Sequence, residues 1–406
     1  MYCLTAGLPP LSVIEIEKPD LVGMGVLTPN VEFSLMLCER IKLRYPGILI
    51  TLGGIHASLF PEKTLQNKNV DFVSLGEGEM NFYDFIYSVN HDINLSKVKS
   101  LGYKKDSKVH INEFNDKFID MNEVGELKYE VIDIEKYLQY AKRQSGYRAI
   151  GYVASRGCAF NCSFCLDGNH KSIVRKWRAI SPSLLVQYIK NWKEKFDIEG
   201  VWFKDSTFSV NKKWIMEFCR LLIENNVQIK WSCNSRVDCI DEDIIKAMSV
   251  AGCETIWFGV ESGSERIIKL MNKRINKKQV FNTFYLCEKY GVRAWANFMI
   301  GVPTETVDDI EQTFNFAMEL QQQSNVDTIH ATVYTPFPGT PLYKLHHNED
   351  FIYSIPPEGL TYDKACIDTG AVKKEVIQMI YDEMCEVFYK DKTRHIDFDK
   401  YRKMKN

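Results

Sequence analysis

The chain has 406 residues, of which 45% are hydrophobic and 26% charged, so it is long enough for two or three domains with sizeable cores. Its 51 Lys and Arg residues nearly balance its 53 Asp and Glu residues, and the net charge of −2 argues against nucleic acid or an anionic membrane as a partner. No continuous apolar stretch of about 18 residues predicts a membrane span. The first 20 residues lack the basic and apolar parts of a signal peptide, so we expect a cytoplasmic protein.

Buried strands alternate with helices near the beginning of the chain, and three apolar segments predict the strands: residues 19–27, 47–54 and 70–79. An amphipathic helix is expected between the first two, over residues 31–45. Apolar strands joined by helices are typical of a parallel sheet covered on both faces. We therefore expect a partial Rossmann-like α/β domain over residues 1–90, followed by a polar linker with short strands over residues 91–147.

Small and polar residues gather directly after these strands. They are Thr28, Gly53, Gly54, His56 and Gly76. Open α/β sheets bind ligands at the carboxyl ends of their strands, and glycine lets a ligand approach the backbone closely. These residues are therefore candidates for a binding site in the first domain.

A more regular alternation begins near residue 148. Six strands are predicted, and each except the last is followed by a helix: 149–155, 200–206, 229–235, 255–262, 293–301 and 328–336. Six units are two short of a closed eight-stranded barrel, so the fold expected for residues 148–345 is a (β/α)6 partial TIM barrel. Residues 346–406 are expected to form a C-terminal helical segment with one helix near 371–390.

Several residues with special side chains or backbone freedom fall at the ends of these strands. Asp205 ends the second strand, Arg236 follows the third, Glu261 and Ser262 end the fourth, and Gly301 ends the fifth. Because the carboxyl ends of parallel barrel strands open on one face, these residues should share the face where active sites lie. Ordinary alternatives stay open: a turn residue for Asp205 and Gly301, and a surface ion pair for Arg236.

Three cysteines follow the first barrel strand in the pattern C-x-x-x-C-x-x-C: Cys158, Cys162 and Cys165. The other nine of the 12 cysteines are scattered, and most are expected to be small buried hydrophobic residues. A structural zinc site or an electron-transfer iron–sulfur cluster normally uses four ligands, and no fourth stands at a suitable spacing. Three cysteines on a [4Fe–4S] cluster would leave one iron open for a substrate or cofactor.

A cysteine loop of this pattern after the first strand of a six-fold barrel resembles the signature of radical S-adenosylmethionine (SAM) enzymes, and the resemblance extends over residues 148–345. It implies a [4Fe–4S] cluster on Cys158, Cys162 and Cys165, with SAM bound at the open iron and cleaved to a 5′-deoxyadenosyl radical. It also implies a small-molecule substrate and an external one-electron reductant of the flavodoxin or ferredoxin type.

The same resemblance implies SAM contacts in three segments. Phe164 matches an aromatic position beside the adenine, and Gly301 lies in the segment MIGVPTET near that base. Glu261 and Ser262, in FGVESGSE, match residues that approach the ribose and the amino acid part of SAM.

The first domain resembles the cobalamin-binding domain that precedes the barrel in one large radical SAM subgroup, through the segments KPDLVGMGVLTPN, LGGIHASLFPE and VDFVSLGEGE. That subgroup includes methyltransferases and the anaerobic magnesium-protoporphyrin ester cyclase. The chain enters the pattern almost at the third strand, so we expect a truncated domain. The lower-ligand motif D-x-H-x-x-G is absent, as it is in many radical SAM relatives. Two interpretations stay open: a corrin over the strand ends at Thr28, Gly53, Gly54, His56 and Gly76, or a vestigial cover. His56 is expected to line its loop or cap a helix, with cobalt ligation as the alternative.

Two charged residues are assigned by their chemistry. Asp205 is expected to face SAM or the substrate, and the planar guanidinium of Arg236 suits bidentate pairing with the SAM carboxylate. No residue is assigned a catalytic role. The function expected is radical SAM chemistry, as cobalamin-dependent methyl transfer or a related C–H or C–C transformation of a small molecule. The alternatives are a radical SAM oxidoreductase without functional cobalamin and a non-catalytic iron–sulfur protein.

Overall fold

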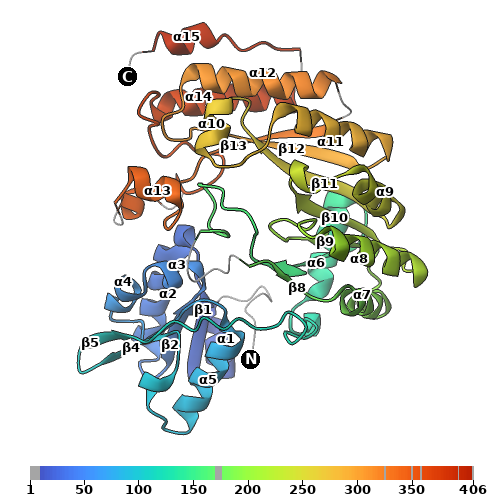
Figure 1. The fold of residues 1–406 in the computed structure, drawn as a ribbon. Helices are drawn as coiled ribbons and strands as arrows, with labels where there is room; N and C mark the ends of the chain where they lie inside the picture. Colours follow the sequence, from blue (N-terminus) through green and yellow to red (C-terminus); the bar gives the residue numbers. More distant parts are fainter. Residues whose placement is uncertain are drawn as a thin grey trace. The chain divides into compact units, whose positions relative to one another are not determined.

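The computed structural model describes most of the chain, in six stretches: residues 10–169, 176–323, 326–348, 351–356, 359–391 and 393–404. The first nine residues of the predicted 1–90 domain lie outside them. The described chain divides into two compact units, one ending at Ile134 and one formed by the described residues from Glu135 onward. Figure 1 colours the first unit from blue to teal, and the second from aquamarine at α6 through green and yellow to red.

The first unit is built on a five-stranded sheet with the order β1-β2-β3-β4-β5. Its strands are β1 (Leu21–Gly25), β2 (Leu49–Gly53), β3 (Phe72–Ser74), β4 (Leu101–Lys105) and β5 (Lys108–Ile111). The first three are parallel, as predicted, with Leu21 opposite Leu49 and Thr51 opposite Phe72. Strands β4 and β5, which come from the stretch after residue 90, extend the sheet in antiparallel pairing.

Helices cover this sheet: α1 (Pro10–Glu17), α2 (Val31–Arg44), α3 (Gly54–Leu59), α4 (Pro61–Gln66) and α5 (Gly78–Asn90). Short 3-10 helices are η1 (Thr28–Asn30) and η2 (Leu95–Lys97). The core consists of fully buried aliphatic side chains, among them Ile41, Ile50, Leu52, Leu65 and Val73. These residues come from strands and helices alike, because a strand in the middle of a covered sheet must be apolar on both faces.

The second unit contains a six-stranded sheet with the order β13-β12-β11-β10-β9-β6, and every neighbouring pair is parallel. The strands are β6 (Ala149–Tyr152), β9 (Gly200–Phe203), β10 (Lys230–Ser235), β11 (Cys253–Glu261), β12 (Arg293–Ile300) and β13 (Val326–Val333). A two-stranded ribbon, β7 (Ser155–Arg156) with β8 (Arg178–Ala179), flanks the first strand. The predicted (β/α)6 partial barrel is confirmed by this strand order.

Helices follow the first five barrel strands in the predicted alternation (Figure 1): α7 (Pro182–Phe196), α8 (Lys212–Glu224), α9 (Glu242–Val250), α11 (Lys277–Lys289) and α12 (Val307–Gln323). The helix predicted near residues 371–390 is α14 (Lys374–Tyr389), and further helices that were not predicted are α6 (Ile134–Ser145), α10 (Glu265–Leu270), α13 (Pro341–His346) and α15 (Phe398–Arg402). The 3-10 helices are η3 (Tyr129–Val131), η4 (Val237–Cys239) and η5 (Phe351–Ser354). Side chains cap the N-termini of two of these helices: Asn211 accepts the Trp214 N–H at the start of α8, and Asp241 accepts the Ile244 N–H at the start of α9. No helix in the described stretches is long and apolar enough to cross a membrane.

Buried and partly exposed side chains alternate along the barrel strands. In β12, Ala294, Ala296, Phe298 and Ile300 are buried, while the residues between them keep partial access to solvent. Successive side chains of a strand point to opposite faces, so one face packs against the helices and the other stays open. Residues just beyond the carboxyl ends of these strands supply most of the charged groups described next.

Candidate functional site

The three predicted cluster cysteines lie on one loop, residues 157–169, which we call the cysteine loop. Cys162 is buried, and Cys158 and Cys165 are half-buried. Burial raises the pKa of the Cys165 thiol to about 12 and also raises that of Cys162. Thiols in such surroundings stay protonated until a metal centre displaces the proton, because the thiolate is the ligand form.

Other segments hold the middle of the cysteine loop by its backbone. The Ser163 N–H donates to the carbonyl oxygen of Met271 at 2.8 Å, and the Ser163 carbonyl accepts from the Leu342 N–H at 2.9 Å. The Asn272 amide donates to the Asn161 carbonyl oxygen at 3.1 Å. The loop is therefore fixed between the segment after α10 and the start of α13.

The loop also closes on itself. The Asn169 side-chain amide donates to the carbonyl oxygens of Cys162 and Cys165, both at 2.8 Å. Gly168 passes so close to Phe160 that a Cβ there would lie 1.9 Å from the Phe160 carbonyl oxygen. Only glycine fits at this position without moving the backbone.

The Arg236 guanidinium connects the loop to its surroundings. It pairs with both carboxylate oxygens of Asp238 at 2.8 Å, donates to the Lys273 carbonyl oxygen at 2.6 Å, and donates to Cys162 Sγ at 3.3 Å. The guanidinium carbon also lies 3.8 Å from the centre of the Phe160 ring. A SAM carboxylate would have to displace Asp238, so the predicted pairing with SAM stays a prediction.

A buried ion pair joins Glu261 to Lys273, with Oε1 and Nζ 2.5 Å apart. Glu261 has a φ of +68° where the register between β11 and β12 shifts, and this turn directs its side chain toward Lys273. A Cβ at Gly259 would lie 2.3 Å from Glu261 Oε1 and 2.5 Å from Lys273 Nζ. The ammonium group lies 5.9 Å from the centre of the Phe164 ring. Sequence reasoning missed Lys273, since nothing in a run of exposed cations marks the one that turns inward.

Asp205 lies beneath the entrance to the cysteine loop. Its carboxylate accepts the Ala154 N–H at 3.1 Å and the Ser155 hydroxyl. Burial raises the pKa of Asp205 to about 6, against the opposing effect of these hydrogen bonds. The structure therefore places Asp205 where it fixes the backbone that leads to Cys158.

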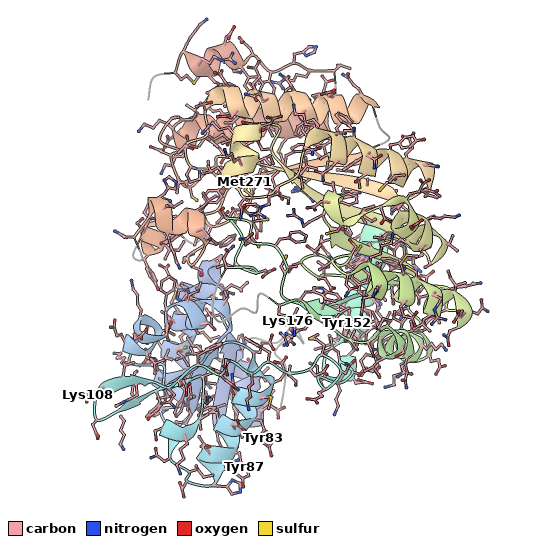
Figure 2. The ribbon with its side chains drawn as sticks, in the orientation of Figure 1. Tyr83, Tyr87, Lys108, Tyr152, Lys176 and Met271 are labelled. Carbon is pink, nitrogen blue, oxygen red and sulfur yellow. The ribbon has the colours of Figure 1, made fainter. Side chains whose placement is uncertain are left out.

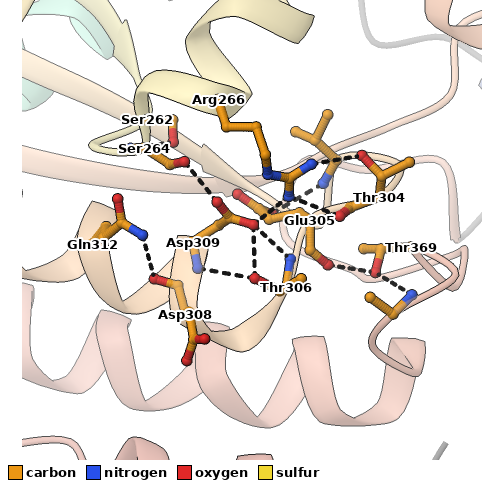
Figure 3. A network of polar contacts seen from close by, with 12 residues as sticks. Ser262, Ser264, Arg266, Thr304, Glu305, Thr306, Asp308, Asp309, Gln312 and Thr369 are labelled. Atoms are coloured by element: carbon orange, nitrogen blue, oxygen red, sulfur yellow. Dashed lines mark hydrogen bonds and ion pairs between the residues drawn. The ribbon is translucent and has the colours of Figure 1, made fainter.

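Ser262 belongs to a network of buried polar groups at the ends of β11 and β12 (Figure 3). Its hydroxyl lies 2.8 Å from the Thr313 hydroxyl and accepts the Ser264 N–H at 3.1 Å. Asp309 accepts hydrogen bonds from Ser264 and Arg266 in the same network. These contacts fix the turn that follows Glu261.

Glu305 closes the turn after β12. Its Oε2 accepts the N–H groups of Gly301, at 2.5 Å, and Val302, at 3.2 Å, while Oε1 has no hydrogen-bond partner among the described residues. Gly301 has a φ of +82°, which suits glycine. Burial raises the pKa of Glu305 to about 8, so the carboxyl group is held near its neutral form.

In the first unit, the side chains of His56 and Thr28 form a hydrogen bond. Nδ1 of His56 lies 3.2 Å from Thr28 Oγ1, and the ring packs against Phe60 with the ring centres 5.2 Å apart. Burial lowers the pKa of His56 to about 4. Gly54 has a φ of +84°, and a Cβ there would lie 2.9 Å from the Val26 backbone. His56 and Gly54 thus hold the strand-end loops against one another.

A pocket of about 680 Å³ opens beside these loops, which we call the glycine pocket. Its lining includes six glycines: Gly23, Gly25, Gly53, Gly54, Gly76 and Gly78. Phe82, Tyr83 and Ile86 of α5 supply apolar surface, and Figure 2 labels Tyr83 and its exposed neighbour Tyr87. The structure brings the predicted Gly53, Gly54 and Gly76 together in this lining, which does not include Thr28 or His56.

No group of three His, Cys, Asp or Glu side chains in the described stretches is arranged around a single metal position. In a [4Fe–4S] cluster each cysteine binds its own iron, so the sulfurs need not converge on one point. Cys158, Cys162 and Cys165 on one fixed loop could therefore each bind a different iron.

Family models match both units of the chain. The model of the Radical SAM superfamily matches residues 152–317, and that of the B12 binding domain matches residues 10–86. The first match covers the cysteine loop and the strand ends from β9 to β12, and the second covers the glycine pocket.

Two relatives illustrate the range of similar proteins. An uncharacterized methyltransferase of Pyrococcus horikoshii is 28% identical over 333 residues, which is 82% of this chain and 70% of the relative. The anaerobic magnesium-protoporphyrin IX monomethyl ester cyclase of Rubrivivax gelatinosus is 25% identical over 337 residues, 80% of this chain and 58% of the cyclase.

Two solved structures share the fold. The cobalamin-dependent SAM radical enzyme OxsB, with aqua-cobalamin and SAM bound, has a TM-score of 0.65 at 19% identity, over 76% of this chain and 45% of OxsB. The radical SAM methyltransferase TsrM from Kitasatospora setae, with cobalamin and a [4Fe–4S] cluster bound, has a TM-score of 0.67 at 14% identity, over 80% of this chain and 66% of TsrM. At these identities the likeness concerns the fold.

Proposed function

Since the chain belongs to the radical SAM superfamily and carries a B12 binding domain ahead of its partial barrel, we propose that it is a cobalamin-dependent radical SAM enzyme that transfers a methyl group to a carbon atom of a small molecule. One observation carries this proposal: a fixed three-cysteine loop and a glycine-lined pocket stand in the same chain. Relatives whose names identify methyltransferases support it.

The cysteine loop fits a cluster held by three thiolates. Cys158, Cys162 and Cys165 would each bind one iron, and the surrounding segments fix their backbone in advance. Arg236 already donates to Cys162 Sγ, and hydrogen bonds to cluster sulfurs tune such centres. Asp205 would keep the loop entrance in place through Ala154.

The glycine pocket fits part of a corrinoid. A Cβ at Gly25 or Gly78 would meet no protein atom within 4 Å, so the missing side chains leave room that a ligand can fill. Phe82, Tyr83 and Ile86 would cover an apolar or aromatic part of the ligand. Because His56 is buried and bonds to Thr28, we assign it to shaping the loops rather than to cobalt.

When bound, the cluster and SAM supply a 5′-deoxyadenosyl radical after one-electron reduction, and cobalamin supplies a carrier for the methyl group. Glu261 and Lys273 would face the ammonium and carboxylate groups of SAM, since the ion pair offers one charge of each sign. Phe164, whose ring lies close to the Lys273 ammonium group, would lie against the adenine of SAM. The Gly301–Glu305 turn would present backbone groups to the base, with Ser262 fixing the neighbouring turn.

The test is an anaerobic reconstitution with iron and sulfide, followed by hydroxocobalamin, removal of free ligand and a visible spectrum. We expect about one corrinoid and about four irons per chain to be retained. Deoxyadenosine should form from SAM on addition of dithionite. Cluster-loaded protein that retains no corrinoid would contradict methyl transfer and favour hydrogen abstraction alone. Failure to form deoxyadenosine would contradict radical SAM activity itself.

A further inference from the structure

Positive charge is concentrated on the segment that joins α10 to α11. Four exposed cations stand within ten residues: Lys269, Arg274, Lys277 and Lys278. Glu265 is the one acidic residue between positions 265 and 278. The whole chain has a net charge of −2, so this excess is local. We call the four cations the basic surface.

The inner side of this segment contacts the cysteine loop. The Met271 carbonyl accepts the Ser163 N–H, and the Asn272 amide donates to Asn161. The Lys273 carbonyl shares the Arg236 guanidinium with Cys162 Sγ. Arg274, the next residue, is exposed, so the basic surface is the outer side of the segment that supports the cysteine loop.

The cations of the basic surface are not neutralised within the chain. Across the described stretches, no ion pair involves any of the four, whereas Lys212 pairs with two aspartates and Arg220 with two glutamates. Arg274 donates to the amide oxygen of Asn272, and Lys277 lies 4.8 Å from the Phe316 ring centre. Neither contact cancels the charge, so the surface can attract an acidic partner.

A recess of about 500 Å³ lies among these cations. Lys269, Arg274 and Lys277 line it together with one acidic residue, Glu265, and the apolar side chains of Ile275 and Phe316. An apolar centre with a charged rim is the usual composition of a protein docking site. Nucleic acid is a less favoured partner, because tight binding to a phosphate backbone requires more cations along a longer surface than these four provide.

We propose that the basic surface docks an acidic one-electron carrier protein, which reduces the centre on the cysteine loop. This inference rests on the proposed function, since only a cluster at Cys158, Cys162 and Cys165 needs the electron. One electron leaves the reduced cofactor of the carrier and enters the cluster, and no atom or proton is transferred. Charge complementarity would raise the association rate by about 10-fold to 1000-fold at low salt, and that gain would fall as salt rises.

The experiment compares chemical and protein reductants. Deoxyadenosine formation is measured with dithionite, and separately with reduced flavodoxin and reduced ferredoxin at increasing concentrations. The test variant is Lys269→Glu/Arg274→Glu/Lys278→Glu, and a milder Lys269→Gln/Arg274→Gln/Lys278→Gln variant guards against misfolding. The matched control is Lys213→Glu/Lys246→Glu/Lys390→Glu, which makes the same charge change at exposed lysines elsewhere in the second unit.

We expect the test variant to keep its dithionite-driven rate and to need at least about tenfold more carrier at low salt. The milder variant should show a smaller shift, the control none, and the difference should shrink at high salt. An unchanged carrier requirement would overturn the proposal, as would no turnover with either carrier or an equal loss with dithionite. If the unsubstituted protein forms no deoxyadenosine with dithionite, the proposed function fails first. Selective loss of binding to RNA or DNA in the variant, with carrier dependence unchanged, would reassign the surface to nucleic acid.

Discussion

The cysteine loop of the second unit is surrounded by buried charges and hydrogen bonds, whereas the glycine pocket of the first unit is lined mainly by bare backbone and apolar side chains, with Glu79 as its one charged side chain. Around the loop, Arg236 and Lys273 each pair with a carboxylate, and both lie close to a cysteine or its neighbour. The pocket instead has room where side chains are missing. The first region is suited to holding charged groups at fixed positions, and the second to admitting a large ligand by shape.

The largest effect should come from a change at the loop alone. Cys162→Ala should lower the iron content from about four per chain to nearly none and abolish deoxyadenosine formation, because one of three ligands is lost. Cobalamin retention should not change, since the glycine pocket shares no residue with the loop. Iron analysis and product chromatography measure this, with Cys385→Ala as the matched control. Four irons and full activity in the Cys162 variant would rule out the three-cysteine site.

The Glu261–Lys273 pair tests how charge holds the loop region together. Lys273→Met should destabilise the second unit by about 3–5 kcal/mol, because it leaves a buried carboxylate unpaired. Adding Glu261→Gln should restore most of that stability, yet SAM affinity should stay at least about tenfold lower, since a hydrogen bond to a charged group is lost. Chemical denaturation and calorimetric SAM binding separate the two effects. Lys269→Met, at an exposed position in the same segment, is the control, and unchanged SAM binding in the double variant would remove the pair from the site.

Shape in the glycine pocket can be tested without disturbing the backbone. Gly25→Leu should reduce cobalamin affinity by about tenfold or more, because the new side chain extends into space that the ligand needs. Gly47→Leu is the matched control, since a Cβ there also meets no atom within 4 Å but lies outside the pocket. Gly54 is a poor choice, because its φ of +84° and close contact with Val26 would strain the fold. Equal cobalamin retention by the Gly25 variant would place the ligand elsewhere.

A change of pH should affect the two units in opposite directions. His56 has its pKa lowered to about 4, so the first unit should lose up to about 3 kcal/mol as the pH falls from 6.5 to 4, because the unfolded histidine binds more protons. Glu305 has its pKa raised to about 8, so its contribution to the second unit is present below pH 4.5 and is lost as the pH rises toward 8.

Hydrogen exchange of each unit as a function of pH measures both slopes. Glu305→Gln should remove the loss at rising pH in the second unit and leave the slope of the first unit unchanged. His56→Gln should remove the loss at falling pH in the first unit and leave the slope of the second unit unchanged. Parallel pH profiles for the two units in the unsubstituted protein would show that neither group governs stability.

Much of the fold could be predicted because it depends on local patterns. Continuous apolar strands separated by amphipathic helices predicted the parallel sheet of the first unit and the six parallel strands of the second, and the structure confirms both. The pairing of β4 with β3 and of β5 with β4 could not be predicted from the sequence, since such short strands carry no period that identifies their partners.

The sequence determined which residues could bear the chemistry, since the spacing of Cys158, Cys162 and Cys165 and the position of Glu261 at a strand end are properties of the chain itself. Only the tertiary structure decided what each residue contacts. It turned Lys273, one cation in a basic run, inward to Glu261, and left its neighbour Arg274 exposed. It also bound Arg236 to Asp238 and set His56 against Thr28. The physical reason is that hydrogen bonds and ion pairs form between groups that folding brings together from distant positions in the sequence. A local pattern of apolar residues does not reveal these partners.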